Sequence, residues 1–165
     1  MKYILIFAAL LSYGALASEF DDTKVLAEQG DAKAQFDLGL TSFSNQNLPD
    51  NYEQAAYWLL KAAKQNYPSA QYSLAFMYEK GLVVEKSNEE AIKWYKEAAS
   101  LGHGSAQYNL GVIYYRGTGV EKDLRQAVYW WTIASKTGML DAWHTLALMY
   151  ANGVERHISD PVLMS

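Results

Sequence analysis

Residues 106–120 read AQYNLGVIYYRGTGV, and parts of this stretch recur along the chain every 36 residues. An alanine opens each copy, a leucine stands four residues later, and glycine or alanine follows the leucine. A tryptophan and another alanine keep the same spacing elsewhere in the repeat. So many positions in one register indicate a tandem repeat. The recurring residues include Ala34, Ala70, Ala106 and Ala142; Leu38, Leu74, Leu110 and Leu146; Trp58, Trp94 and Trp130; and Ala55, Ala91 and Ala127.

Each copy is predicted to form two helices. In the first copy the first helix is expected over about residues 34–45, because Ala34, Leu38 and Thr41 share one stripe at about 100° per residue. Second helices are expected over about residues 52–65, 89–100 and 124–136, with the tryptophans on their buried edge. Glycine, or next best asparagine, tolerates the left-handed conformation that stops a helix. The residues that we expect to end the first helices are Asn45, Gly81, Gly117 and Gly153.

The 106–120 stretch, continued by Asp123, Ala127, Trp130, Ala134 and Gly138, resembles a full Sel1-like repeat, a relative of the tetratricopeptide repeats. The resemblance covers about residues 25–154. It implies an all-α solenoid of α/α hairpins in a right-handed superhelix, with about three full and one truncated 36-residue repeats. It also implies a scaffold or adaptor. The first copy departs from the pattern at Ser42 and at residues 45–48, so its packing should be looser.

The two ends of the chain lie outside the repeats. Lys2, the apolar run over residues 3–11 and the small-x-small triplet at 15–17 are typical of a cleaved secretory signal over residues 1–17. The run is shorter than the roughly 20 apolar residues that span a bilayer, so no stable membrane insertion is expected after cleavage. We predict a periplasmic or secreted location. The further divisions are a capping helix over 18–33, the solenoid over 34–153 and a tail over 154–165.

The last repeat lacks its second helix in the sequence pattern. The buried edge of its first helix, with Ala142, Leu146, Met149 and Tyr150, is therefore left without its usual cover. Terminal repeats of solenoids need such a cover. Either residues 162–164 fold back over this edge or another chain covers it, which leaves a homodimer through the last repeat open.

Composition excludes several classes of function. The chain of 165 residues has no cysteine, so disulfides, thiolate metal sites and cysteine nucleophiles are ruled out. Its net charge of −4 gives no basic face for nucleic acid. Its three histidines, His103, His144 and His157, have no metal-ligand spacing, and we expect neither a metal nor a cofactor. His103 stands at a loop-to-helix position, where a capping role is expected.

One tripeptide raises an enzymatic alternative. Lys136-Thr137-Gly138 matches the Lys-Thr-Gly of penicillin-binding enzymes and class A β-lactamases. The chain has no Ser-x-x-Lys motif, and the tripeptide aligns with the plain end of a second helix in the preceding copy. A cell-wall or β-lactam hydrolase is therefore disfavoured, and we predict that the chain is not an enzyme.

A row of apolar residues supports a binding function. Positions 36, 40 and 43 of the first helix and their copies lie opposite the core stripe, where solvated residues would be charged. In solenoids of the family that the chain resembles, this face lines the concave surface. The alternative for the flanking positions 36 and 43 is packing against the adjacent repeat. The predicted partner-binding residues are Phe36, Leu40, Tyr72, Phe76, Tyr108, Val112, Tyr115, His144 and Leu148.

Contiguous apolar surface of this kind marks an interaction site. We therefore predict an exported scaffold or adaptor that holds a protein or peptide partner in its concave groove. The resemblance to Sel1-like proteins also implies a sharper version, an immunity-type inhibitor of an envelope-targeting effector. A secreted virulence factor is the further alternative.

Overall fold

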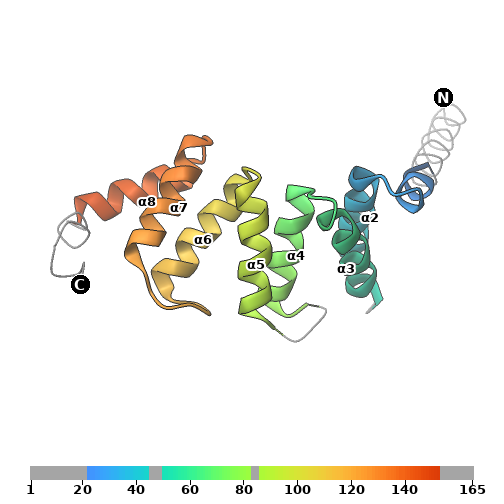
Figure 1. Cartoon of the computed structure of the whole chain (residues 1–165), viewed down its shortest axis with the longest axis horizontal. Coiled ribbons are helices and arrows are strands. Elements are labelled where there is room, and N and C mark those ends of the chain that lie inside the picture. The colour runs from blue at the N-terminus through green and yellow to red at the C-terminus, as the bar shows by residue number, and fades with distance from the viewer. Residues whose placement is uncertain (1–21, 45–49, 83–85, 153–165) are drawn as a thin grey trace, which may run out of the picture. The chain divides into compact units, whose positions relative to one another are not determined.

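A computed structural model describes residues 22–44, 50–82 and 86–152 of the chain. These described residues form helices and turns only (Figure 1). The predicted signal peptide over 1–17, the tail over 154–165, Asn45 and Gly153 lie outside them. A short helix at 22–28 precedes α2 (Ala32–Ser44), α3 (Asp50–Ala63), α4 (Pro68–Lys80), α5 (Asn88–Ser100), α6 (Gly104–Arg116), α7 (Leu124–Lys136) and α8 (Leu140–Ala151).

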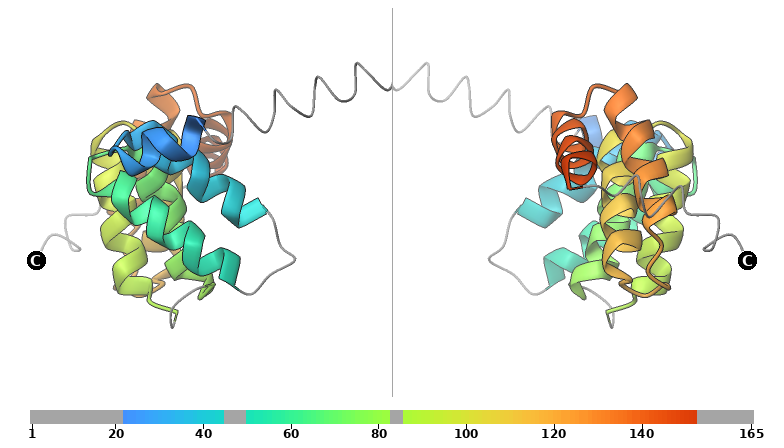
Figure 2. Two further views of the ribbon diagram at one scale, coloured as in Figure 1. Left: turned by 90° about the vertical axis from the view of Figure 1, so that its right-hand side faces the viewer. Right: turned by 90° about the vertical axis from the view of Figure 1, so that its left-hand side faces the viewer.

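The predicted all-α hairpin architecture is confirmed. The helix α7 matches its predicted bounds, whereas α2 and α3 each begin two residues before their predicted starts. The chain divides into two compact units, residues 1–67 and 68–165. In the first unit α2 packs on α3. In the second unit α4 to α8 pack in chain order, and their connecting turns alternate between two ends (Figures 1 and 2).

Recurring caps begin and end the helices. The Ser87 side chain accepts a hydrogen bond from the backbone N–H of Glu90, and Asp123 in the same register caps α7. Such caps satisfy backbone donors that have no partner inside the helix. Gly81 and Gly117 follow α4 and α6 with positive φ angles of 64° and 71°. Both glycines therefore end first helices as predicted.

The two helices of a hairpin come closest where a small residue of the first helix packs against a large residue of the second. A Cβ atom added to Gly39 would lie 2.7 Å from Cγ of Leu59, and one added to Gly111 would overlap the indole of Trp131. Trp131 is only 2% exposed, and its indole N–H donates to the carbonyl of Tyr108 over 3.1 Å. The close approach buries a large apolar side chain, which is the main stabilising contribution to such a contact.

The large partners lie one position after the predicted tryptophans. Leu59, Tyr95 and Trp131 share one register and are almost fully buried. The predicted tryptophans are half-buried and pack at the rims of the cores. Trp58 packs on the cluster of Ala27, Ala34 and Leu38, and Trp94 and Trp130 pack on the cluster around Tyr95.

Two buried glutamine side chains bond neighbouring helices to each other. The side-chain amide of Gln35 donates to the carbonyl of Ala27, and that of Gln107 donates to the carbonyl of Ala99, each over 3.0 Å. Each bond joins a first helix to the helix before it. Gln71 occupies the same register and is equally buried. Because a buried amide is costly unless it is hydrogen-bonded, these bonds fix the register between neighbouring helices.

The contact between Gly111 and Trp131 gives a test of hairpin packing. Gly111→Leu should lower the free energy of unfolding by about 1–3 kcal/mol, because the added side chain would overpack a filled core. Ala147→Leu is the matched control, since Ala147 holds the equivalent position on α8 and is exposed. Urea denaturation followed by circular dichroism measures both. Equal losses of stability in the two variants would contradict the proposed packing.

Candidate functional site

A pocket of about 600 Å³ opens in the second unit, between α4 and α6 and against α5. Four residues of the predicted row line it: Tyr72 and Phe76 from α4, and Tyr108 and Val112 from α6. The helix α5 packs on both α4 and α6, so it holds these two helices on either side of the pocket. The structure therefore gathers part of the predicted row around one hollow.

The other predicted residues lie elsewhere. Tyr115 is exposed beside Trp131, with their ring centroids 5.7 Å apart, and it does not line the pocket. Leu40, His144 and Leu148 are exposed. Phe36 is half-buried against Tyr67, with ring centroids 5.1 Å apart. Phe36 belongs to the first unit, and His144 and Leu148 belong to α8.

The flanking aromatic residues also contact their own hairpins. The ring of Tyr72 lies 5.7 Å from that of Tyr95 and 4.6 Å from that of His103, centroid to centroid. Tyr108 contacts Trp131 with a centroid distance of 6.3 Å. These contacts hold the two tyrosines in place while part of each stays accessible from the pocket. At this position of the repeat, each tyrosine is thus partly packed against its own hairpin and partly exposed.

One carboxylate lines the pocket, and it is already engaged. Glu79 accepts a hydrogen bond from the buried Tyr95 hydroxyl over 2.8 Å and an ion pair from Lys80 over 2.7 Å. Burial acts to raise the pKa of Glu79, but the bonds from Lys80 and Tyr95 hold it below its ordinary value. Burial, aided by Glu79, raises the pKa of Tyr95. The pair is therefore an ionised carboxylate bound to a neutral phenol at neutral pH.

Two cations and one amide oxygen of the pocket residues are not bound to a partner in this way. Among the described residues, the buried side-chain oxygen of Asn88 has no hydrogen-bond donor. Lys86 and Arg116 also line the pocket, and neither has a carboxylate within salt-bridge distance in the described part of the chain. These groups offer one acceptor and two cations to a bound molecule.

His103 caps α6, as the sequence predicts. Its Nδ1 accepts a hydrogen bond from the backbone N–H of Ala106 over 3.3 Å. Its ring stacks on Tyr72 at an interplanar angle of 20°. Burial lowers the pKa of His103. The neutral imidazole is required here, because a protonated ring has no lone pair with which to accept the bond.

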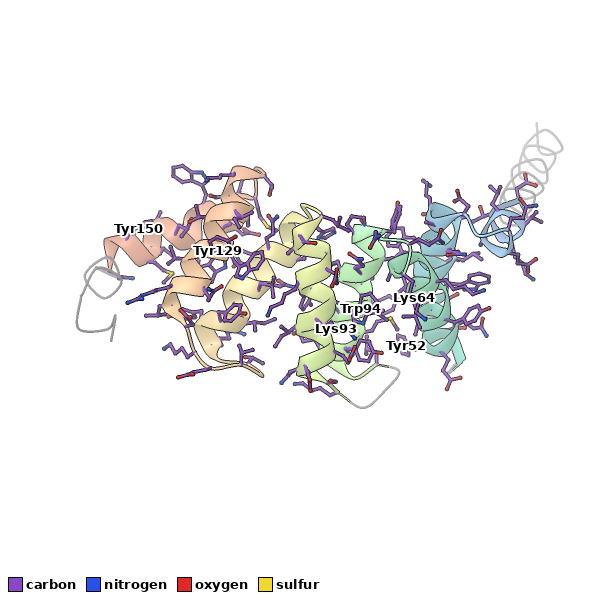
Figure 3. All side chains as sticks on the ribbon, in the orientation of Figure 1. Tyr52, Lys64, Lys93, Trp94, Tyr129 and Tyr150 are labelled. Atoms are coloured by element: carbon purple, nitrogen blue, oxygen red, sulfur yellow. The ribbon has the colours of Figure 1, made fainter. Side chains whose placement is uncertain are left out.

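The edge of α8 that was predicted to lack its cover is buried except at Tyr150, because Ala142, Leu146 and Met149 pack in one cluster with residues of α7. Another face of α8 is exposed instead and carries an apolar strip, which we call the α8 strip: Leu140, Trp143, Ala147 and Tyr150. In the preceding hairpin the equivalent Gly104 and Gly111 face α7, where an added Cβ would meet Thr137 and Trp131. No described helix lies on this face of α8, so Leu140 is 82% and Trp143 66% exposed. Tyr150 lies at the far end of the strip (Figure 3).

The chain matches a known family of repeats, and the matched segments follow its hairpins. The Sel1 repeat profile matches residues 32–67, 68–103 and 104–138. The chain belongs to the Sel1 repeat family. Each matched segment holds one hairpin, from a first helix to the turn after the second. The resemblance drawn from the sequence is thereby confirmed, and no curated protein matches the chain significantly.

Solved structures of other Sel1-type proteins share this architecture. A Sel1 repeat protein of Oxalobacter formigenes is 36% identical, with a TM-score of 0.71 over 78% of this chain and 97% of that one. The protective antigen c5321 of uropathogenic Escherichia coli strains, which has an SLR fold, is 35% identical with a TM-score of 0.76. This alignment covers 81% of our Sel1-repeat chain but only 28% of the antigen.

A third structure, the cysteine-rich protein B of Helicobacter pylori, is 29% identical with a TM-score of 0.63, over 76% of this chain and 96% of that one. Sel1-repeat proteins are typically non-catalytic scaffolds for protein–protein interaction. In the described part of this Sel1-repeat chain, no three histidine or acidic side chains converge on one point. No helix there is both long and apolar enough to cross a bilayer.

The cap on α6 predicts a pH-dependent stability. Burial lowers the pKa of His103 in the folded chain. As the pH drops below about 6.5, the unfolded chain therefore takes up a proton at His103 before the folded chain does, and the free energy of unfolding falls. His103→Asn keeps a good capping residue and removes the titration. Urea denaturation at pH 7.5 and 5.5 should show a smaller loss of stability in the variant. Equal losses in the two proteins would refute this role of His103.

Proposed function

We propose that the pocket between α4 and α6 binds a protein partner. The observation that carries the proposal is the convergence of Tyr72, Phe76, Tyr108 and Val112 on one hollow of about 600 Å³. Interfaces concentrate their binding energy where an anchoring side chain enters a pocket lined by aromatic and aliphatic groups. The scaffold role typical of the Sel1 repeat family supports the same function.

The chemistry of the pocket argues for binding rather than catalysis. None of the described residues that line it is a serine or histidine, so the lining holds no serine paired with an imidazole base. The imidazole of His103 stacks on the lining residue Tyr72, but its Nδ1 already accepts the capping bond from the backbone N–H of Ala106. Its one carboxylate, Glu79, is held ionised by Lys80 and Tyr95. The tripeptide at residues 136–138 ends α7 and forms its C-cap, away from the pocket. A hydrolase therefore has no support from this site, and we propose a non-enzymatic role.

We also propose that the chain is exported. The signal-like pattern over residues 1–17 supports a periplasmic or secreted location. The protective antigen among the solved relatives supports exposure to a host, and with it the alternative of a secreted virulence factor. An immunity-type inhibitor of an envelope-targeting effector fits an exported scaffold that binds a protein partner in its groove.

The binding proposal predicts a loss of partner capture in a groove variant. The full chain is immobilised and exposed to an envelope extract of its source cells, and the recovered protein is quantified. Phe76→Asp with Val112→Asp should reduce recovery of a stoichiometric partner at least about tenfold, because two charges would enter the apolar wall. Tyr129→Asp is the control, since Tyr129 is exposed on α7 outside the pocket (Figure 3).

Circular dichroism and thermal unfolding establish that each variant is folded. Undiminished capture by a folded groove variant would place the partner elsewhere on the chain. Loss of capture by the Tyr129 variant alone would shift the binding surface to the outer face of α7. The proposal requires the first variant to fail and the second to succeed.

A second surface favours self-association. We propose that two copies of the chain pack through the α8 strip, in place of the helix that covers the equivalent face of α6. The strip is apolar and carries no charge, so a two-fold axis would bring identical patches together without like-charge repulsion. Trp143, at 66% exposure, supplies the large aromatic side chain typical of an interface core.

Light scattering tests this homodimer. The wild-type chain should show a mass that rises toward twice that of the monomer with concentration, and Trp143→Asp should abolish the rise. Leu101→Asp is the matched control, because Leu101 is an exposed apolar residue outside the α8 strip. A monomeric wild-type chain at all concentrations, or a Trp143 variant that still dimerises, would reject the homodimer.

A further inference from the structure

The residues that line the pocket carry a net positive charge, whereas the net charge of the whole chain is negative. The pocket is lined by three basic side chains, Lys80, Lys86 and Arg116, and by one carboxylate, Glu79. The whole chain, in contrast, has a net charge of −4. The local excess of positive charge favours an acidic ligand and disfavours a basic one, since charge complementarity selects partners.

Two of these cations are available to a ligand. Lys80 is paired with Glu79, whose second oxygen accepts the Tyr95 hydroxyl. Neither Lys86 nor Arg116 has a carboxylate within salt-bridge distance among the described residues, although the charge of Lys86 also helps to lower the pKa of Glu79. Both side chains are exposed, so they can close on an anion without first breaking an ion pair.

Lys86 and Arg116 lie toward one end of the pocket and the rings of Tyr72 and Tyr108 toward the other, whereas Phe76 lies under the ammonium group of Lys80. Arg116 lies in the last turn of α6, eight residues after Tyr108. Lys86 packs near the end of α4, where its Cβ would lie 3.2 Å from a Cβ added to Gly81. Eight residues of helix span about 12 Å. That length corresponds to about three to four residues of an extended peptide at roughly 3.3 Å each.

The side chain of Asn88 bears on the backbone conformation of the bound segment. Asn88 lines the pocket, and its buried side-chain oxygen has no hydrogen-bond donor among the described residues. An extended peptide has free backbone N–H groups that can satisfy such an acceptor, whereas a helical segment uses most of its own. An extended segment of a protein therefore matches the positive charge of the pocket, its length and the unpaired oxygen of Asn88.

We infer that the pocket selects an extended peptide with an acidic side chain three to four residues from a large apolar one. The apolar side chain lies against Tyr72, Tyr108 and their neighbours, and the carboxylate lies between Lys86 and Arg116. This inference rests on the proposed function, because it specifies the chemistry of the partner that the same pocket binds.

A peptide selection tests the inference. Random peptides displayed on phage are selected on the full chain and depleted on the folded Phe76→Asp, Val112→Asp variant. The survivors should be enriched in Asp or Glu at three to four residues from Phe, Trp, Tyr or Leu. Their affinities for purified proteins are then measured by fluorescence polarisation with synthetic copies.

Charge reversal supplies the matched comparison. Lys86→Glu with Arg116→Glu should weaken the selected peptides by about tenfold or more, because the carboxylate would meet two like charges. Lys96→Glu with Lys136→Glu makes the same change of net charge outside the pocket and should alter affinity less than about twofold. Peptides with Lys in place of the acid should bind the first variant better than the wild type.

The outcomes separate the inference from the function that it specifies. Peptides that need the apolar wall but show no acidic enrichment, or that bind both charge variants equally, overturn the inference and leave the proposed function standing. Selection that yields no peptide dependent on Phe76 and Val112 counts against both. Enrichment in acids together with loss of binding in the first charge variant alone supports both.

Discussion

The close approach of two helices within each hairpin is the constraint on which the rest of the structure depends. At Gly111 the absence of a side chain lets the indole of Trp131 come against the backbone of α6 and donate to the carbonyl of Tyr108. Gly39 and Leu59 repeat the arrangement in the first unit. The contact directs the core face of the first helix toward its partner, so the opposite face is left for other uses.

That division of faces creates the pocket. Because the core stripe of α6 is turned inward, Tyr108 and Val112 are turned toward the hollow beside α4. The helix α5 packs on both neighbours and holds them apart. The Tyr95 hydroxyl anchors Glu79 on the same hollow, and His103 caps α6 while it stacks on Tyr72. The residues that stabilise the hairpins therefore also fix the geometry of the site.

Periodicity alone predicted the helices, the glycine ends and the cap at His103, because those features use the same residue type in successive copies or a position defined by them. It did not reveal the buried partners Leu59, Tyr95 and Trp131, since three unlike residues fill that register. The buried glutamines repeat faithfully, but their role depends on a carbonyl eight residues earlier, as in the bond from Gln107 to Ala99.

The candidate site was predicted only in part for a related reason. The pattern treats all copies of a row alike, whereas a pocket also needs a neighbouring helix on the other side. Tyr72, Phe76, Tyr108 and Val112 meet that condition, and Leu148 on α8 does not. The basic end of the pocket was not recognised from the sequence, because Lys86 and Arg116 are 30 residues apart and converge only through the hairpin turns.

Site-specific photo-crosslinking tests the central claim, that the hollow between α4 and α6 holds the partner, most directly. A benzophenone amino acid replaces Phe76 in one protein and Tyr129 in another, and each is irradiated with the captured partner. The account predicts a covalent adduct from position 76 and none from position 129, which is exposed on α7. An adduct from position 129 with none from position 76 would contradict it.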